Sequence, residues 1–424
     1  MFLHIDVDSF FASAERVFDP SLRGIPMAVG SRSNLEIFES KRSRIRLMND
    51  NSGAFVAPVF YSDATRTFES YFVDDDSKGE RCIRGIITSA SYEARACGVK
   101  TAMPVAQALQ CCPQMVVVPS CYPRYHRLSK ALHRFICSKI PQVEQYSIDE
   151  FFADVSGWVS KKEVYAFASK LKEEIMQKFM LPVSIGISDA KWIAKLATES
   201  AKPYGVFMVE DIESYTRTIP IEDFPGIGKG FARKLKAHHI HTLGDIKAQE
   251  ALFNRWKKPG IQLYKRVTGT DGEGISGKST RKSIGISRTF DPIYDISEIK
   301  RRIMVMARHI CYMAMAINAN PTTYYLRVGY ENGTRIKVRR KVTRIFSEPL
   351  FKKSLEEMFE SEEKPYCGAI KLTVTVSDFT KDTPRTLSLL SLDEDRSRWH
   401  LTRTMQRLRE RFGLDIIKTG SELY

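Results

Sequence analysis

The sequence lacks the patterns that would place it in a membrane, in a disulfide-bonded class or in a zinc-binding class. No apolar run approaches the roughly 20 residues of a membrane span, and Asp6 and Asp8 interrupt the apolar start, so we expect neither a span nor a signal peptide. The eight cysteines are scattered without a CxxC pair, which favours reduced thiols in the cytoplasm. The GxxxxGK[ST] pattern of a nucleotide P-loop is also missing.

The length and the net charge of the chain are more informative. Its 424 residues, 43% of them hydrophobic, predict a soluble, globular protein of about three domains. A net charge of +15 and a sequence pI of 9.3 indicate a polyanionic partner. The excess is uneven, because residues 281–424 carry 27 Lys and Arg against 18 Asp and Glu, or +9 of the total. A merely basic soluble protein is the alternative.

Two stretches place carboxylates near the ends of strands. Residues 2–7 alternate apolar and polar side chains and include Asp6, as in a half-buried strand. In Ser147–Glu150, Asp149 and Glu150 interrupt an otherwise apolar, strand-forming segment, where unpaired charge is costly to bury. If the two strands are neighbours, the three carboxylates form a cluster that needs cations, and oxygen ligands without His or Cys partners point to Mg²⁺. A tight turn with a solvated acidic pair is the alternative.

The remaining N-terminal pattern indicates an α+β layer. Asp8 can cap a helix after the first strand. The order strand, helix, carboxylate-bearing hairpin, helix, strand fits a ferredoxin-like arrangement. Residues 31–85 interrupt this order with charges that nearly cancel, and we expect them to form a solvated, partly ordered insert.

A glycine-rich turn at 225–230 precedes a further helical stretch. Free backbone N–H groups at a helix N-terminus suit a phosphate. Gly226, Gly228 and Lys229 resemble the hairpin of helix-hairpin-helix modules, which grip a DNA backbone without reading its sequence. An ordinary helix connection is the alternative.

The last third predicts a separate domain. Four glycines within 269–277 indicate a flexible linker, and a β-α-β-β-α-β unit follows, with a hairpin signal at Glu331–Thr334. In the strand at 334–343, four cations share one face at intervals of about 6.5 Å and form a track for a nucleic-acid backbone. They are Arg335, Lys337, Arg339 and Lys341. A solvated charged face is the alternative. An amphipathic helix at 399–412 is predicted near the C-terminus.

With these pieces in place, the sequence resembles a Y-family, translesion DNA polymerase of the bacterial DNA polymerase IV type. The resemblance covers nearly the whole chain except residues 31–85 and the extreme tail, and its motifs occur in the family's order. They are Asp6–Ala12, Tyr92–Arg95, Ser147–Glu150, Gly186–Ser188 with Ala201–Pro203, Pro225–Gly228 and Arg281–Gly285.

The resemblance implies an α+β, multidomain, right-hand polymerase with a ferredoxin-like palm, small fingers, a helical helix-hairpin-helix thumb and a β-α-β-β-α-β little finger. On this chain the parts would be a palm at 1–10 and 121–209, fingers at 11–120 with the insert 31–85, a thumb at 210–268, a linker at 269–281, a little finger at 282–390 and a C-terminal tail helix at 391–424.

The resemblance also implies chemistry. The chain would extend a primer on template DNA by two-metal phosphoryl transfer, with low fidelity and without proofreading, in DNA damage tolerance. Asp6, Asp149 and Glu150 would hold two Mg²⁺ ions, with the Val7 carbonyl as a further ligand. The protein would position and neutralise charge rather than supply a covalent nucleophile.

Four residues would contact the incoming dNTP. Tyr92, Arg95 and Lys202 would hold its triphosphate. Phe11 would be a steric gate beneath the sugar, where a ribose 2′-OH would collide with the ring; plain core packing is the alternative for Phe11.

Other functions stay open at this point. A nucleotidyl cyclase also uses two Mg²⁺ ions on a ferredoxin-like layer, but leaves the glycine-rich turn and the basic C-terminal domain unexplained. A non-catalytic DNA-binding scaffold leaves the intact carboxylates unexplained. Residues 386–390 lie where this group often carries a sliding-clamp motif, here without its Gln or Phe, which makes clamp binding a further hypothesis. We expect a cytoplasmic monomer that does not contact membranes.

Overall fold

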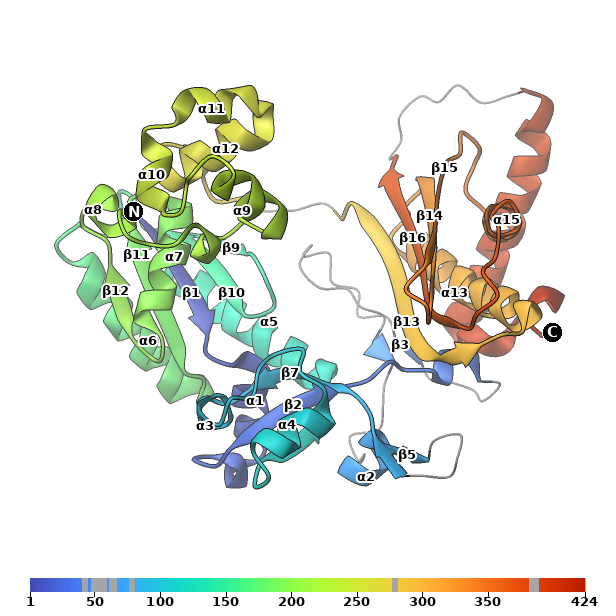
Figure 1. Ribbon diagram of the computed structural model, residues 1–424, viewed down its shortest axis with the longest axis horizontal. Helices are drawn as coiled ribbons and strands as arrows, with labels where there is room; N and C mark the ends of the chain where they lie inside the picture. Colours follow the sequence, from blue (N-terminus) through green and yellow to red (C-terminus); the bar gives the residue numbers. More distant parts are fainter. Residues whose placement is uncertain are drawn as a thin grey trace. The chain divides into compact units, whose positions relative to one another are not determined.

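The computed structural model describes residues 1–39, 45–46, 59–60, 67–75, 81–276, 281–380 and 389–423. The described chain forms two compact units (Figure 1). The first unit contains the described residues of 1–31 and 67–276. The second contains residues 32–39 and 281–423, together with two short strands of the insert, β3 (Ile45–Arg46) and β4 (Val59–Phe60).

A five-stranded sheet in the first unit carries the predicted carboxylates. Its strand order is β12-β11-β1-β10-β9, and neighbouring strands are antiparallel except β11 with β12. The strands are β1 (Phe2–Val7), β9 (Gln142–Gln145), β10 (Glu150–Asp154), β11 (Val183–Ser188) and β12 (Val206–Met208). Helices α5 (Tyr122–Lys139) and α6 (Val164–Phe179) pack on one face, and α7 (Lys191–Ala201) packs on the other (Figure 1).

The alternation of apolar and polar residues in β1 explains why the two faces of the sheet differ. Leu3, Ile5 and Val7 are buried with the apolar residues of α5 and α6, so the predicted alternation is confirmed. On the other face α7 lies very close to β11, because a Cβ at Gly186 would come within 2.1 Å of the Ala194 carbonyl oxygen. Any side chain at this position would push α7 away from the sheet.

A three-stranded sheet of order β7-β2-β8 forms the core of the expected fingers. Its strands are β2 (Met27–Ser31), β7 (Ile86–Ala90) and β8 (Val116–Pro119). The accompanying elements are α1 (Phe10–Phe18), α2 (Phe68–Phe72), β5 (Val73–Asp75), β6 (Arg81–Ile83), α3 (Tyr92–Ala96) and α4 (Val105–Cys111).

Five short helices form the expected thumb, still within the first unit. They are α8 (Ile212–Thr216), α9 (Lys229–Lys236), α10 (Leu243–Lys247), α11 (Glu250–Arg255) and α12 (Lys257–Thr268). The segment after α12 has no helix or strand up to residue 276, as expected of a linker. It is nevertheless held in place, because Glu273 accepts hydrogen bonds from Arg266 Nη2 at 2.8 Å and from Trp192 Nε1 at 2.8 Å.

The second unit contains the predicted β-α-β-β-α-β order, which is confirmed. Its sheet has the order β13-β16-β14-β15, and its two long helices bury apolar residues against one face of that sheet. The elements are β13 (Ser283–Ile293), α13 (Ile296–Ala316), β14 (Pro321–Tyr330), β15 (Arg335–Lys341), α14 (Glu348–Glu360) and β16 (Ala369–Phe379).

The expectation of a solvated insert is wrong for two of its segments. Ile37 and Phe38 are buried in the core of the second unit, where the Phe38 ring lies 6.4 Å from the ring of Phe290. The Arg302 guanidinium lies 4.7 Å from each of these rings. Phe72, in α2, is fully buried in the core of the fingers. Apolar side chains at both ends of the insert are therefore removed from water.

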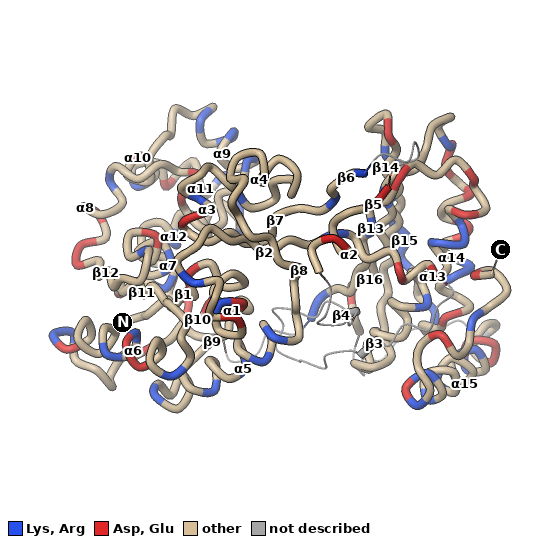
Figure 2. Tube along the Cα trace, turned by 90° about the horizontal axis from the view of Figure 1, so that it is seen from below, with Lys and Arg blue, Asp and Glu red and all other residues tan. Residues whose placement is uncertain are grey.

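The C-terminal helix is longer than the amphipathic stretch predicted at 399–412 and ends before the end of the tail helix expected at 391–424. Helix α15 (Leu389–Phe412) begins ten residues before position 399 and packs on α13 and α14. Both signs of charge occur along it (Figure 2). Arg409 forms a buried ion pair with Glu348, and Lys352 Nζ lies 2.6 Å from Glu422 Oε1, so the end of the chain is part of this core. Of the clamp hypothesis at 386–390, residues 386–388 lie outside the described residues, and clamp binding stays a prediction.

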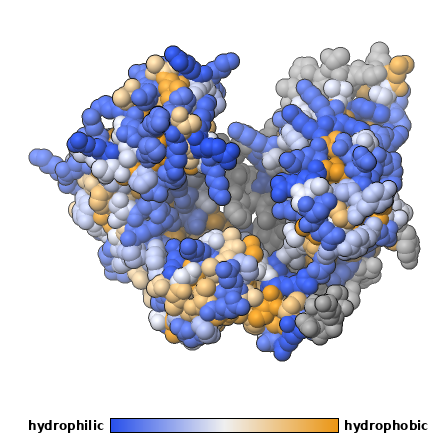
Figure 3. All heavy atoms as spheres, viewed as in Figure 1, coloured by the Kyte–Doolittle hydropathy of each residue, from blue (hydrophilic) through white to orange (hydrophobic). Residues whose placement is uncertain are grey.

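The described surface offers no sign of a membrane span. Among the described residues, none of the helices has the length and hydropathy to cross a bilayer. The face of the protein in Figure 3 is largely hydrophilic.

Candidate active site

Strands β1 and β10 bring two of the predicted carboxylates together. In the antiparallel register Asp6 pairs with Glu150, so both side chains project from the same face of the sheet, the face that α7 covers. Asp149 immediately precedes β10, and its carbonyl oxygen accepts a hydrogen bond from the Val7 N–H at 3.1 Å. The two acidic strands are therefore neighbours, which is the condition under which the sequence predicts a carboxylate cluster.

Burial dominates the electrostatics of this cluster. Burial raises the pKa of Asp6 from its ordinary value of 3.8 to about 7. The Lys202 ammonium opposes this shift, and the charges of Asp149 and Glu150 add smaller upward contributions. Burial is also the main cause that raises the pKa of Asp149. Asp6 and Asp149 are thus costly to ionise without cations nearby.

Two lysines supply that positive charge. Lys202 Nζ lies 2.8 Å from Asp6 Oδ2, and Lys195 Nζ forms an ion pair with Glu150. Lys195 also lies 3.5 Å from Nε2 of His4, whose pKa burial lowers well below its ordinary value, so this imidazole is neutral. Neither Lys195 nor His4 was predicted. The available signal was spacing, because Lys195 precedes Lys202 by two helical turns.

The donor chemistry of the cluster fits a hard divalent cation, since carboxylate oxygens are the ligands that Mg²⁺ prefers. Among the residues that the structure describes, however, no three His, Cys, Asp or Glu side chains converge as a ligand set. The ion pairs explain this, because Asp6 and Glu150 face Lys202 and Lys195. Binding of cations would require these carboxylates to exchange their lysine partners.

Helix α3 positions the two predicted triphosphate contacts of the fingers. Arg95 follows Tyr92 by one turn, and its guanidinium lies 5.1 Å from the centre of the Tyr92 ring. Arg95 Nε donates to the Ala90 carbonyl at 3.0 Å. Tyr92 Oη donates to Asp8 at 3.2 Å, which brings Tyr92 to the end of β1, the strand that also carries Asp6.

The predicted role of Asp8 as a helix cap is wrong. Ser9 occupies the N-cap of α1, and no side chain caps this helix. The Asp8 carboxylate instead accepts hydrogen bonds from Ser184, Tyr204 and Tyr92. Ser184 and Tyr204 lie 176 and 196 positions further along the chain, so no local sequence signal reveals this role.

Phe11 lies in the first turn of α1 and is partly buried. Its ring stacks on Tyr125 with 4.5 Å between centroids and meets the edge of Tyr122 at 5.8 Å. The ring is therefore supported from behind while part of it stays accessible. This geometry is compatible with both the gate and the packing role.

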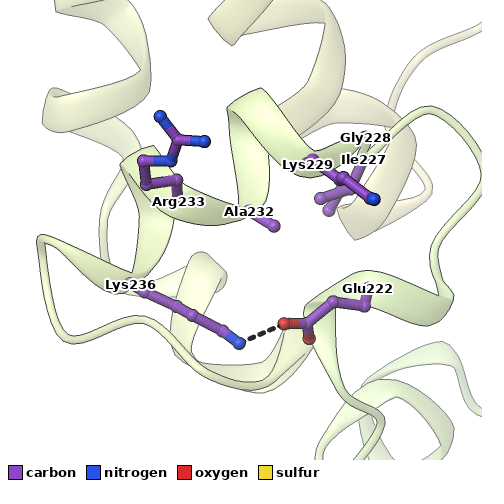
Figure 4. A pocket seen from close by; sticks show the side chains of 7 residues that line it. All are labelled: Glu222, Ile227, Gly228, Lys229, Ala232, Arg233 and Lys236. Atoms are coloured by element: carbon purple, nitrogen blue, oxygen red, sulfur yellow. Dashed lines mark ion pairs between the residues drawn. The ribbon is translucent and has the colours of Figure 1, made fainter.

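The glycine-rich turn of the thumb lines a hollow of about 630 Å³ (Figure 4). Gly226 has φ +103°, a left-handed conformation that favours glycine, and a Cβ at Gly228 would meet nothing within 4 Å. Lys229 and Arg233 from α9 line the same hollow, and Lys236 forms an ion pair with Glu222 at its edge.

The predicted basic track lies on β15, an edge strand of the second sheet. Its four cations are exposed and alternate with Ile336 and Val338, which face the core side, so the prediction of a shared face is confirmed. Arg339 also lies over the ring of Tyr325, at 5.5 Å from its centroid.

Sequence comparisons identify relatives over most of the chain. Residues 5–199 match the impB/mucB/samB family, and residues 281–389 match the C-terminal domain of that family. A protein of Cronobacter sakazakii named DNA polymerase IV is 30% identical over 295 residues, which cover 68% of this chain and 70% of the relative. DNA polymerase IV of Yersinia enterocolitica is 29% identical over 299 residues, or 69% and 71% of the two chains.

Solved structures share the fold. A Y-family DNA polymerase chimera, Dbh-Dpo4(243-245)-Dbh, aligns with a TM-score of 0.68 at 23% identity and covers 89% of this chain and 98% of its own. DinB from Sulfolobus solfataricus aligns with a TM-score of 0.52 at 21% identity over the same shares of 89% and 98%.

Proposed function

Because the chain belongs to the impB/mucB/samB family of Y-family, DinB-type DNA polymerases, we propose that it extends the 3′ end of a DNA primer along a template with deoxynucleotides, including past damaged bases. The observation that carries this proposal is the register of β1 with β10, which pairs Asp6 with Glu150 and joins Val7 to Asp149.

The carboxylates Asp6, Asp149 and Glu150 hold two Mg²⁺ ions in this proposal, with the Val7 carbonyl oxygen as a further ligand. When bound, the ions supply Lewis acidity and neutralise charge on the phosphates during an in-line displacement. The protein contributes the neighbouring strands β1 and β10, whose register fixes the carboxylates, and Lys195 would leave Glu150 as cations take its place.

The triphosphate of the dNTP binds Tyr92, Arg95 and Lys202. Support comes from the contacts around the end of β1, where Tyr92 bonds to Asp8 and Lys202 pairs with Asp6. Lys202 would exchange its carboxylate partner for a phosphate oxygen as cations take over Asp6. A phosphate would likewise compete with Asp8 for the single hydroxyl proton of Tyr92.

Primer-template DNA binds at two basic surfaces. The turn with Gly226, Gly228 and Lys229 leaves room for a phosphate at the start of α9, whose backbone N–H groups are free to donate. The exposed face of β15 contacts the backbone through Arg335, Lys337, Arg339 and Lys341.

Phe11 acts as the steric gate against ribonucleotides. Its ring is backed by Tyr125 and Tyr122 and cannot yield easily to a 2′-OH. In the variant Phe11→Ala we expect ribonucleotide incorporation relative to deoxynucleotide incorporation to rise by about two orders of magnitude, or roughly 3 kcal/mol. Single-nucleotide incorporation with matched dNTP and rNTP measures this ratio. The control Phe135→Leu removes a palm ring remote from Phe11 in sequence, and a rise equal to that of Phe11→Ala would reduce Phe11 to ordinary packing.

Primer extension with Mg²⁺, all four dNTPs and either undamaged or lesion-bearing template tests the function. Extension that EDTA abolishes supports the proposal. A cyclic product from NTP alone would indicate a cyclase, and DNA binding without any turnover would indicate a scaffold; either result would overturn it.

A further inference from the structure

We propose that Asp8 is a positioning residue that fixes the triphosphate-binding groups Lys202 and Tyr92 against the end of β1. This inference rests on the proposed function, because it assumes that these two residues bind the dNTP. Asp8 itself belongs to neither the predicted metal ligands nor the predicted triphosphate contacts.

The Asp8 carboxylate accepts hydrogen bonds from three separate parts of the chain: β11, the turn at Tyr204 and α3. Ser184 Oγ, on β11, lies 2.9 Å from Oδ1 and 3.0 Å from Oδ2. The Tyr204 backbone N–H donates to Oδ2 at 2.8 Å, and Tyr92 Oη, on α3, donates to Oδ1 at 3.2 Å. Only 1% of the Asp8 surface is exposed, so water does not compete for these bonds.

The Tyr204 bond fixes the turn that presents Lys202. Only Pro203 separates the two residues, and Tyr204 adopts a left-handed conformation with φ +51°. Lys172 Nζ donates to the Tyr204 carbonyl at 3.1 Å and lies 3.9 Å from the centre of its ring. The N–H and the carbonyl oxygen of Tyr204 are therefore both hydrogen-bonded, and loss of the Asp8 acceptor would break the bond of the N–H.

The Tyr92 bond positions the fingers side of the same group before the dNTP binds, since the single Tyr92 proton would pass from Asp8 to a phosphate oxygen on binding. Asp8 holds the Tyr92 ring, and Arg95 stacks on that ring at 5.1 Å. One buried carboxylate thus sets the spacing between a lysine that follows α7 and a tyrosine–arginine pair on α3. Ser184 anchors that carboxylate to the central sheet.

Steady-state incorporation of one dNTP by the full chain tests this role with the variant Asp8→Asn. The substitution keeps the size of the side chain but replaces one acceptor oxygen with an NH2 donor, so that Ser184, Tyr204 and Tyr92 are left with a single acceptor oxygen. We expect KM for dNTP to rise at least about tenfold with kcat within about threefold, because positioning is lost while the carboxylates that hold metal remain. The affinity for primer-template DNA should stay unchanged.

Asp154→Asn is the matched control, since Asp154 lies at the far end of β10 and pairs with Phe2 rather than Asp6. A double-mutant cycle adds a second measurement: Tyr92→Phe should raise KM less in the Asp8→Asn background than in the wild type, because the bond it removes is already disturbed. If Asp8→Asn does not fold, Ser184→Ala loosens the same carboxylate, and a KM increase of about threefold is expected.

The outcomes separate the two proposals. An unchanged KM in Asp8→Asn and in Ser184→Ala, with a lowered melting temperature, would make Asp8 a purely structural polar residue and overturn the inference. If Lys202→Met and Arg95→Ala also leave KM for dNTP unchanged, the proposed triphosphate site itself is wrong. If KM rises in Lys202→Met and Arg95→Ala but not in Asp8→Asn, the triphosphate site is supported and only the positioning role of Asp8 is wrong.

Discussion

The protein carries two groups of charged side chains, the carboxylate–lysine pairs of the first unit and the cations of β15 in the second unit. The two groups differ in how far they are exposed to solvent. In the first unit, Asp6 and Glu150 are largely buried and each has a specific lysine partner. On β15 of the second unit the cations are open to solvent, and the Arg339 side chain is 64% exposed. Buried charges depend on one another, because removing one leaves its partner unpaired in a low-dielectric site. Exposed charges contribute small, nearly additive and salt-screened amounts.

The largest effect should come from the buried cluster. Replacing Glu150 by Gln removes a charge that the cations need and leaves Lys195 without its partner. We expect primer extension to fall by about three orders of magnitude or more, or roughly 4 kcal/mol of barrier. Single-turnover extension measures the loss, and DNA affinity should be retained. Asp154→Asn, on the same strand, should extend normally; extension by Glu150→Gln within tenfold of wild type would refute the assignment.

A second effect concerns stability and pH. The folded-state pKa of Asp6, about 7, lies above its ordinary value of 3.8, so folding favours the protonated form. Its stabilising contribution is fully present below about pH 4 and is lost as pH rises through about 7, at a cost of at most about 4 kcal/mol.

Asp6→Asn mimics the protonated form and should remove this dependence. Urea unfolding in EDTA at pH 5 and pH 8 measures the difference between wild type and variant. We expect Asp6→Asn to gain stability relative to the wild type at the higher pH. A difference that does not change with pH would show that Asp6 is ionised throughout.

The smallest effect is expected on the exposed strand. Replacing Arg335 and Lys337 by Ala should weaken binding to primer-template DNA by about tenfold at low salt. The slope of log Kd against log salt should fall by about two, because two phosphate contacts are lost. Glu356→Ala, on α14, serves as a surface control. An unaltered slope would exclude β15 from the DNA interface.

Local patterns predicted the elements better than they predicted the contacts between them. The β-α-β-β-α-β order of the second unit followed from strand alternation and from the turn at Asn332 and Gly333, and the structure confirms it. The pairing of β1 with β10 remained a condition at the level of the sequence, because carboxylates on two strands indicate one cation site only if the strands are neighbours.

Residues whose partners lie far along the chain were misjudged. Asp8 has the composition of a helix cap, and only the fold brings Ser184 and Tyr204 to it. Phe38 belongs to a stretch with balanced charge, and nothing near it indicates that Phe290 covers its ring. The amphipathic stretch at 399–412 covers only part of α15, which begins at Leu389, two residues before the tail helix expected at 391–424, and packs on α13 and α14.

The burial of the insert changes what a break in the chain would do. A single proteolytic nick between Ser276 and Arg281 would yield two polypeptides on a denaturing gel. The N-terminal fragment would still contribute Ile37 and Phe38 to the core of the second unit. The nicked protein would therefore elute from a native sizing column as one particle.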